Sequence, residues 1–182
     1  PIYGIDYKKY KNGVKPDKNF FTYTFFGRLG ISKGLDILLE AASAFNIKHR
    51  DARLKLIIPK RPSYFFKKVN KIIRTRKLAE STIILHNLPE QKLKAELLKS
   101  DCIVIPSYSE GFCFAAAEAI ALRIPLITSN RTALKEVVSG RHINMKDFSA
   151  EGLVEALESA KKDKWNETAI KEFRLSKQIN DY

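Results

Sequence analysis

The sequence is poor in the residues that build metal centres and disulfide frameworks. Its 182 residues include two cysteines, three histidines and one methionine. The cysteines, Cys102 and Cys113, form no Cys-x-x-Cys pair, so we expect no zinc site and no metal ligands. We expect both to be buried free thiols in a reducing cytosol, and the alternative is a Cys102–Cys113 disulfide.

Long apolar runs and targeting signals are also missing. No run approaches the ~18 residues that would suggest a membrane-spanning helix, and no secretory signal pattern occurs. With 45% hydrophobic and 29% charged residues, the composition is that of a soluble globular protein. We expect one cytoplasmic domain over residues 1–182. Because the chain begins at Pro1 and not at Met, we also expect it to be part of a longer protein.

Acidic residues are few relative to basic ones, which leaves a net charge of +13. The surplus is concentrated in residues 60–77, which contain no acid and carry apolar residues at helical spacing. This pattern predicts a basic amphipathic helix. Its outer face is either simply solvated or suited to an anionic membrane surface; nucleic acid is an unlikely partner because aromatics are not interleaved as on a stacking platform. The cations are Lys60, Arg61, Lys67, Lys68, Lys71, Arg74, Arg76 and Lys77.

Apolar strand patterns alternate with helical patterns along the chain. Alternation of this kind predicts an α/β fold, a Rossmann-like doubly wound parallel sheet of about six strands with helices on both faces. Ligands of such sheets bind at the carboxyl ends of the strands. The expected strands are 19–26, 53–58, 82–85, 102–105, 125–128 and 141–145; the expected helices are 35–45, 60–77, 90–98, 112–122, 130–138, 149–160 and 165–182, after a lead-in loop over residues 1–19.

The most informative stretch is residues 101–130, which predicts a buried strand, a polar elbow, an alanine-rich helix and a second strand. At the helix start, the N–H groups of Phe112, Cys113 and Phe114 offer a site for phosphate. Glu118, inside the helix, either binds ligand hydroxyls or pairs with a core cation. Glu110, just before the helix, is either a ligand-binding group or an N-terminal cap.

A second candidate lies in residues 27–34, GRLGISKG. It follows a strand and precedes a helix, and it matches neither the G-x-G-x-x-G fingerprint nor the P-loop. Its glycines allow close approach of a ligand to the backbone, and Arg28 and Lys33 place two cations beside a helix start. The alternative is that both are ordinary surface cations.

Two of these segments resemble the retaining GT-B glycosyltransferases. The segment PSYSEGFCFAAAEAIA resembles the family's E-x7-E signature, whose usual form is P-S-x-x-E-G-F-G-x-x-x-x-E-A-x-A. The segment FFGRLGISKGLDILLEA resembles the family element F-x-G-R-x-x-x-x-K-G-x-D-x-L-L-x-A. A weaker resemblance is that of residues 3–10 to the segment that opens the second half of these enzymes. The resemblance identifies the chain as the C-terminal, donor-nucleotide-binding domain of such an enzyme.

The resemblance also implies roles for individual residues. Arg28 and Lys33 would contact the donor diphosphate, together with the helix start at Gly111, Phe112, Cys113 and Phe114. Glu110 would bind donor-sugar hydroxyls, Glu118 the ribose hydroxyls, and the turn at Leu88 the base through its backbone. Glu110, Arg28 and Lys33 would be the catalytic residues, whereas His86 is expected to be structural.

The implied reaction is a retaining hexosyl transfer from a UDP-, GDP- or ADP-sugar, without a cofactor. No D-x-D motif occurs, so cations of the chain would carry the diphosphate charge without a metal. An N-terminal domain would bind the acceptor, and this piece alone would be inactive. The sequence departs from the family pattern at Cys113, which replaces a glycine, and at Leu122-Arg123, which replace a small residue and a glycine. Asn87 and Pro59 also stand where glycine is commoner.

Overall fold

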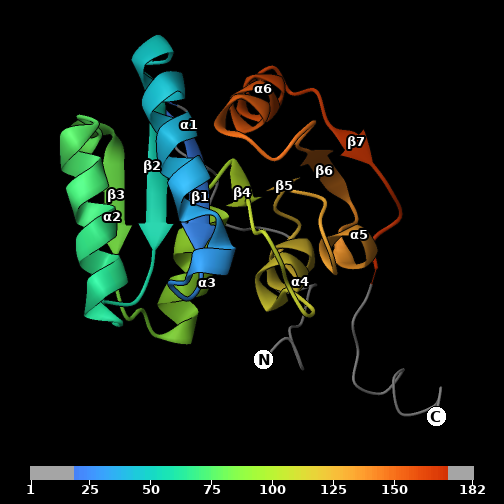
Figure 1. Cartoon of the computed structure of the whole chain (residues 1–182). Helices are drawn as coiled ribbons and strands as arrows, with labels where there is room; N and C mark the ends of the chain where they lie inside the picture. The colour runs from blue at the N-terminus through green and yellow to red at the C-terminus, as the bar shows by residue number, and fades with distance from the viewer. Residues whose placement is uncertain (1–18, 172–182) are drawn as a thin grey trace.

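The structure, a computed structural model, describes residues 19–171 (Figure 1). Lead-in residues 1–18 therefore lie outside the described residues. Six strands are parallel: β1 (Phe21–Phe26), β2 (Ala52–Ile57), β3 (Thr82–Leu85), β4 (Cys102–Ile105), β5 (Leu126–Thr128) and β6 (Arg141–Asn144); β7 (Asn166–Glu167) is antiparallel. The helices are α1 (Leu35–Lys48), α2 (Ser63–Thr75), α3 (Glu90–Leu98), α4 (Phe114–Ala121), α5 (Leu134–Val137) and α6 (Ala150–Lys161), with 3-10 turns η2 (Ile31–Lys33) and η3 (Ala79–Ser81).

The strands form one sheet in the order β3-β2-β1-β4-β5-β6-β7. The central strands are continuous apolar runs, and β4 is buried along its whole length, as expected for parallel strands covered on both faces. The order reverses between β1 and β4, whose carboxyl ends lie side by side. Ligands of open parallel sheets bind at this kind of switch point, so the fold directs attention to the residues after Phe26 and Ile105. The expected Rossmann-like fold is confirmed.

Helices cover both faces of the sheet and create two hydrophobic cores. On one face α1 lies between α2 and α6 (Figure 1). On the other face α3, α4 and α5 pack over β4 and β5. Ser149 caps α6 by accepting a hydrogen bond from the Gly152 N–H, as its sequence position predicts. Within residues 19–171, no helix is long and apolar enough to cross a membrane.

The expected helix over residues 165–182 is wrong in its described part. Residues 166–167 form β7, which pairs with the edge of the sheet at β6. Thr168 accepts a hydrogen bond from the Gly140 N–H through Oγ1 and donates its own N–H to the Gly140 carbonyl. These long-range hydrogen bonds outweigh the local helical pattern. Residues 172–182 lie outside the described residues.

Three other helices begin later than expected. The helix expected over residues 60–77 is α2, Ser63–Thr75, which begins after Pro62 in an extended conformation. Residues with positive φ interrupt the other two. Cys113, with φ of 70°, delays the start of α4 from residue 112 to Phe114. Asn130 and Thr132, with φ of 53° and 46°, confine α5 to Leu134–Val137. A left-handed residue cannot continue a right-handed helix, so both segments begin as loops.

Candidate functional site

A hollow of about 450 Å³ opens at the carboxyl ends of β1 and β4, where the strand order reverses. It brings together all but one of the candidate site residues. Arg28 and Lys33 come from the loop after β1, Glu110 from the loop after β4, and Glu118 from α4. The lining residues are Phe25, Phe26, Gly27, Arg28, Lys33, Ile105, Ser107, Glu110, Gly111, Phe112, Cys113, Phe114, Ala115 and Glu118.

The loop after β1 is fixed against the loop after β4 by a close backbone approach at Gly34. Gly34 has φ of 63°, and a Cβ added there would lie 1.8 Å from the Pro106 carbonyl oxygen. Only glycine fits this position. Nearby, the Tyr108 N–H donates to the Ser32 carbonyl over 2.8 Å. The loop that carries Arg28 and Lys33 is thereby held against the loop that carries Glu110.

Lys33 and Glu110 form an ion pair at the centre of the hollow. The Lys33 Nζ lies 2.8 Å from both carboxylate oxygens of Glu110. Ser107 Oγ donates a further hydrogen bond of 2.7 Å to Glu110 Oε1. The two charged side chains are only 21% and 10% exposed. Glu110 is therefore not the helix cap that the alternative interpretation required; that position belongs to Cys113.

The backbone of Glu110 is anchored as firmly as its side chain. Its N–H donates to Thr132 Oγ1 over 2.9 Å, and Ser129 Oγ donates to the Ser107 carbonyl over 2.6 Å. Sequence reasoning did not single out Ser107, Ser129 or Thr132. Ser107 could have been found, because it belongs to the P-S-x-x-E pattern. Thr132 lies 22 residues from Glu110 in the sequence and is brought to it by the pairing of β4 with β5. No sequence motif around Thr132 predicts this contact.

The start of α4 lines the same hollow. The first N–H groups of an α-helix have no acceptor within the helix and favour anions. Phe114 and Ala115 open α4, and both line the hollow. Burial, with the nearby Glu110 carboxylate as a second cause, raises the pKa of the Cys113 thiol to about 12. Cys113 is therefore a neutral, packed side chain beside the anion-favouring helix start.

Glu118 is a partly buried carboxylate on the hollow's helix side. Burial raises the pKa of its carboxyl group above the ordinary value. It forms no salt bridge with any residue of the range 19–171. No direct ion pair is formed within the described part of the chain, although the positive charge of Lys94 lowers the pKa of Glu118 against the larger effect of burial. A carboxylate of this kind is open to hydrogen bonds from ligand hydroxyls.

Leu88 is the one candidate outside the lining of the hollow. It follows β3, two strands away from β1, and packs against the core beneath α3 and α4. Asn87 beside it has φ of 47°, the left-handed conformation expected where glycine is commoner. His86 has a structural setting: its Nδ1 lies 2.9 Å from the Ile58 carbonyl, and its ring meets Phe66 edge-on.

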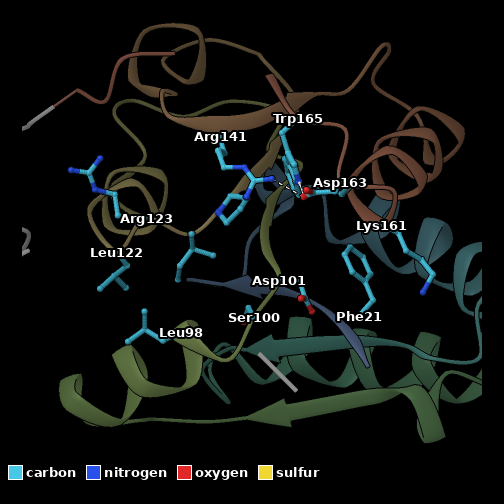
Figure 2. A pocket seen from close by; sticks show the side chains of 13 residues that line it. Phe21, Leu98, Ser100, Asp101, Leu122, Arg123, Arg141, Lys161, Asp163 and Trp165 are labelled. Carbon is cyan, nitrogen blue, oxygen red and sulfur yellow. Dashed lines mark hydrogen bonds and ion pairs between the residues drawn. The ribbon is translucent and has the colours of Figure 1, made fainter. Parts of the chain in front are cut away.

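A different hollow, of about 480 Å³, lies at the opposite, amino-terminal edge of the sheet (Figure 2). Two of its cations are already paired. Arg141 donates to Asp163 over 2.7 Å and lies over the Trp165 ring, and Lys161 pairs with Asp51. These contacts connect the end of α6 to the sheet, so the charge of this hollow is largely compensated. The carboxyl-edge hollow is the better candidate site.

Comparison with known proteins agrees with the fold. The family model described as glycosyl transferases group 1 matches residues 6–178. A protein described as uncharacterized, 41.2 kDa, in the cps region of Klebsiella pneumoniae, is 27% identical in an alignment of 183 positions that covers 94% of this chain and 47% of that protein. A D-inositol 3-phosphate glycosyltransferase of Pseudarthrobacter chlorophenolicus is 31% identical in an alignment of 133 positions that covers 70% of this chain and 30% of that enzyme.

Solved structures share the fold at low sequence identity. A glycosyltransferase from Rickettsia africae superposes with a TM-score of 0.75 at 20% identity, over 88% of this chain and 46% of that one. The C-terminal domain of a glycosyl transferase group 1 family protein from Francisella tularensis gives a TM-score of 0.67 at 22% identity, over 89% of this chain and 86% of that domain. The chain thus spans at most about half of its full-length relatives but most of an isolated C-terminal domain.

Proposed function

The chain belongs to the glycosyl transferases group 1 family, and on that premise we propose that it is the donor-binding half of a retaining hexosyltransferase. The donor is a UDP-, GDP- or ADP-sugar, bound in the hollow after β1 and β4. One observation carries the proposal: two cations, a helix start and two carboxylates converge at the switch point of the sheet. Cations and helix N–H groups suit a diphosphate, and carboxylates suit hydroxyl groups.

Arg28 and Lys33 would neutralise the diphosphate. Arg28 is exposed at the mouth of the hollow, where its planar guanidinium can bind two phosphate oxygens, whereas Lys33 acts as a point charge. Charge grows on the leaving diphosphate as the sugar–phosphate bond breaks, and fixed cations stabilise it. With the α4 start beside them, these residues supply the counter-charge that a divalent metal provides in other transferases, and we propose a metal-independent reaction.

The ion pair between Lys33 and Glu110 gives the site two states. The Lys33 ammonium group donates to both carboxylate oxygens of Glu110. A diphosphate would share or take over the ammonium group, and Glu110 would then accept hydrogen bonds from the sugar hydroxyls. Ser107 and Thr132 would keep Glu110 in place during this exchange. Glu118 would accept hydrogen bonds from the ribose, and the backbone at Leu88 would contact the base.

The acceptor is proposed to bind to another, N-terminal half of the enzyme. The chain spans 47% of one curated relative and 46% of one full-length structure. Three large apolar side chains are exposed around the hollow's edge: Ile31 at 82%, Tyr108 at 40% and Phe114 at 57%. A partner domain over the carboxyl edge would cover them. This half alone would then bind a donor without transferring its sugar.

Calorimetry with UDP-glucose, GDP-mannose and ADP-glucose tests the proposal. We expect one of them to bind, and the Arg28→Ala and Glu118→Ala variants each to weaken binding about tenfold or more, since each removes charge-assisted hydrogen bonds. The matched control is Arg50→Ala, which removes an exposed arginine at the opposite edge. If none of the three binds, or if both site variants bind as the wild type does, the proposal fails.

A second candidate function, which can coexist with the first, is attachment to an anionic membrane surface through α2. The buried side of this helix, including Val69 and Ile73, packs on the sheet. Its outer side is cationic, and Tyr64 at its start is 70% exposed. Of the eight cations in residues 60–77, only Arg76 forms a salt bridge within the described chain, at 3.3 Å to Glu40. The apolar face is already used, so binding would be electrostatic.

Sedimentation with phosphatidylglycerol vesicles tests this second function. Binding is expected at low salt, to weaken with added salt, and to be lost when Lys67, Lys68 and Lys71 are all changed to Gln. Phosphatidylcholine vesicles should not bind the wild type. Vesicle binding that does not depend on salt concentration, or that the triple variant retains, would contradict attachment through α2.

A further inference from the structure

A second hollow at the carboxyl edge, of about 490 Å³, lies beside the proposed donor site and has no role in it. It is formed by the loop after β5 and the loop after β6. Arg131 and Lys135 come from the first loop and from α5, and Lys146 comes from the second loop. Three cations from separate parts of the chain thus converge on one concave surface.

These cations have no anionic partner within residues 19–171. Arg131, Lys135 and Lys146 form no salt bridge there. The one carboxylate in the lining, Asp147, instead accepts a hydrogen bond from Ser149 Oγ at the start of α6. Arg131 lies over the Phe148 ring, 5.0 Å from its centroid. The arrangement differs from the amino-edge hollow, where two of three lining cations are paired, and its three cations outnumber its one carboxylate, which leaves a surplus of positive charge to attract an oxyanion.

The two carboxyl-edge hollows share a wall. Ser107 and Glu110 line the donor hollow, whereas Ser129 and Thr132 line the second one. Hydrogen bonds cross between them, from Ser129 Oγ to the Ser107 carbonyl and from the Glu110 N–H to Thr132 Oγ1. At the rim, the rings of Tyr108 and Phe148 pack with centroids 4.2 Å apart. A group bound in the second hollow would lie across Glu110 from the donor diphosphate.

The backbone of the second hollow is held in an unusual conformation. Asn130 and Thr132 both have positive φ, which β-branched threonine rarely adopts. Strained residues of this kind gather at ligand-binding loops, where the surrounding structure maintains them. In this loop the left-handed conformation of Asn130 and Thr132 places Thr132 against Glu110. Arg131, which lies between these two residues in the sequence, lines the hollow.

We propose that this second hollow is an oxyanion subsite for the acceptor, which carries a phosphate or a carboxylate group. The proposal rests on the proposed donor site. Arg131 would provide a two-pronged contact to the oxyanion, and Lys135 and Lys146 would neutralise its charge. The donor's own diphosphate is served by Arg28 and Lys33 on the other side of Glu110. The second subsite thus selects acceptors that bear a negative group near the reacting hydroxyl.

Titration of the chain with inorganic phosphate, followed by backbone amide NMR, tests the subsite. To remove phosphate binding at the donor hollow, the titration is done on Arg28→Ala. We expect saturable shifts at residues 129–132 and 145–148. Changing Arg131, Lys135 and Lys146 to Gln should weaken this binding at least about tenfold, since charge-assisted hydrogen bonds are lost. The matched control changes Lys67, Lys68 and Lys71 to Gln, an equal loss of charge on α2, and should leave the shifts unchanged.

Acetate at equal ionic strength separates the two sources of the oxyanion: equal affinity for acetate indicates a carboxylate, and preference for phosphate indicates a phosphorylated acceptor. Shifts that are absent, that do not saturate, or that survive the triple change would overturn the subsite. Its failure is distinct from failure of the donor site. If only the subsite fails, the nucleotide sugar still binds. If only the donor site fails, phosphate still shifts residues 129–132 and 145–148, but no nucleotide sugar binds.

Discussion

Glu110 is held from three directions, and within residues 19–171 one cation, Lys33, pairs with its carboxylate. Lys33 and Ser107 bind its carboxylate, and Thr132 accepts its backbone N–H. The sequence allowed both Glu110 and Lys33 to be assigned to one site, because the carboxyl ends of neighbouring parallel strands meet at one edge. It could not predict that they pair with each other, since 77 residues separate them and side-chain direction depends on the fold.

Removing the negative charge of Glu110 is expected to separate two functions of the site. In Glu110→Gln, Lys33 is released for phosphate, so the free nucleoside diphosphate should bind about threefold to tenfold tighter. The extra affinity contributed by the sugar should fall, because an amide is a weaker acceptor than a carboxylate. Calorimetry with the diphosphate and with its sugar measures both effects. The control Glu80→Gln removes an exposed charge on η3. Weaker binding of the free diphosphate in Glu110→Gln would contradict this account.

The burial of Glu118 predicts that the free energy of unfolding depends on pH. Because burial raises the pKa of its carboxyl group in the folded state, the folded protein binds this proton more tightly than the unfolded chain does. The contribution to stability is complete below the ordinary value of 4.5 and is lost as pH rises through the folded pKa. Glu118→Gln should therefore be more stable than the wild type at pH 7.5, with a smaller difference at pH 4.

Urea unfolding at the two pH values measures the difference. A Glu118→Gln variant that is less stable than the wild type at pH 7.5 would show that the carboxylate has a stabilising cationic partner. That result would favour the core ion pair over the hydroxyl-binding role.

At the scale of elements, three helices end in the same way without glycine. After α4, the Ile124 N–H bonds to the Ala119 carbonyl and the Arg123 N–H to the Ile120 carbonyl. This is the Schellman pattern, whose left-handed residue is usually glycine. Here that residue is Arg123, with φ of 59°; α2 and α6 end likewise at Lys77 and Asp163.

The departures of the sequence from the family pattern therefore have a geometric meaning. Cys113 and Arg123 were singled out because glycine is usual there, and both have positive φ. The fold keeps the left-handed backbone even where the side chain opposes it. Cys113 is buried and packed in the core around α4, whereas Arg123 is exposed. Burial of the side chain therefore offsets the backbone strain at Cys113 but not at Arg123.

Arg123→Gly is expected to stabilise the protein by about 0.5–1 kcal/mol. Glycine relieves the strain of the left-handed backbone, and this gain exceeds the cost of the greater conformational entropy that glycine gives the unfolded chain. Arg123→Ala is the control, because alanine retains the strain and should give no such gain. Chemical denaturation compares the three proteins. Equal stability of the Gly and Ala variants would mean that the left-handed conformation costs nothing at this position.

Strands and helices were predictable to different degrees, for physical reasons. The six parallel strands are short apolar runs that only a covered sheet can bury, so their existence follows from composition. Residues 165–171 were predicted as helix and are not, because β7 is formed by pairing with β6 rather than by local preference. The late starts of α4 and α5 depend on single left-handed residues, which hydrophobic periodicity does not reveal.

At the scale of the whole molecule, the carboxyl edge of the sheet and the outer side of α2 are two separate surfaces. The carboxyl edge carries the donor hollow, the cationic second hollow and the exposed side chains of Ile31, Tyr108 and Phe114. The basic outer side of α2 lies beyond β2 and β3, at one end of the sheet (Figure 1). A partner domain could therefore cover the carboxyl edge while α2 faces an anionic surface.

The most direct test of the central claim is a map of amide chemical shifts as the nucleotide sugar that binds best is added. We predict that the largest changes occur at residues 27–34 and 107–118, with smaller ones at 86–88. At the same sub-saturating ligand concentration, Arg28→Ala should strongly reduce these changes, whereas Arg50→Ala should not. Changes centred on the amino-edge hollow of Figure 2, around Arg141 and Trp165, would contradict the claim.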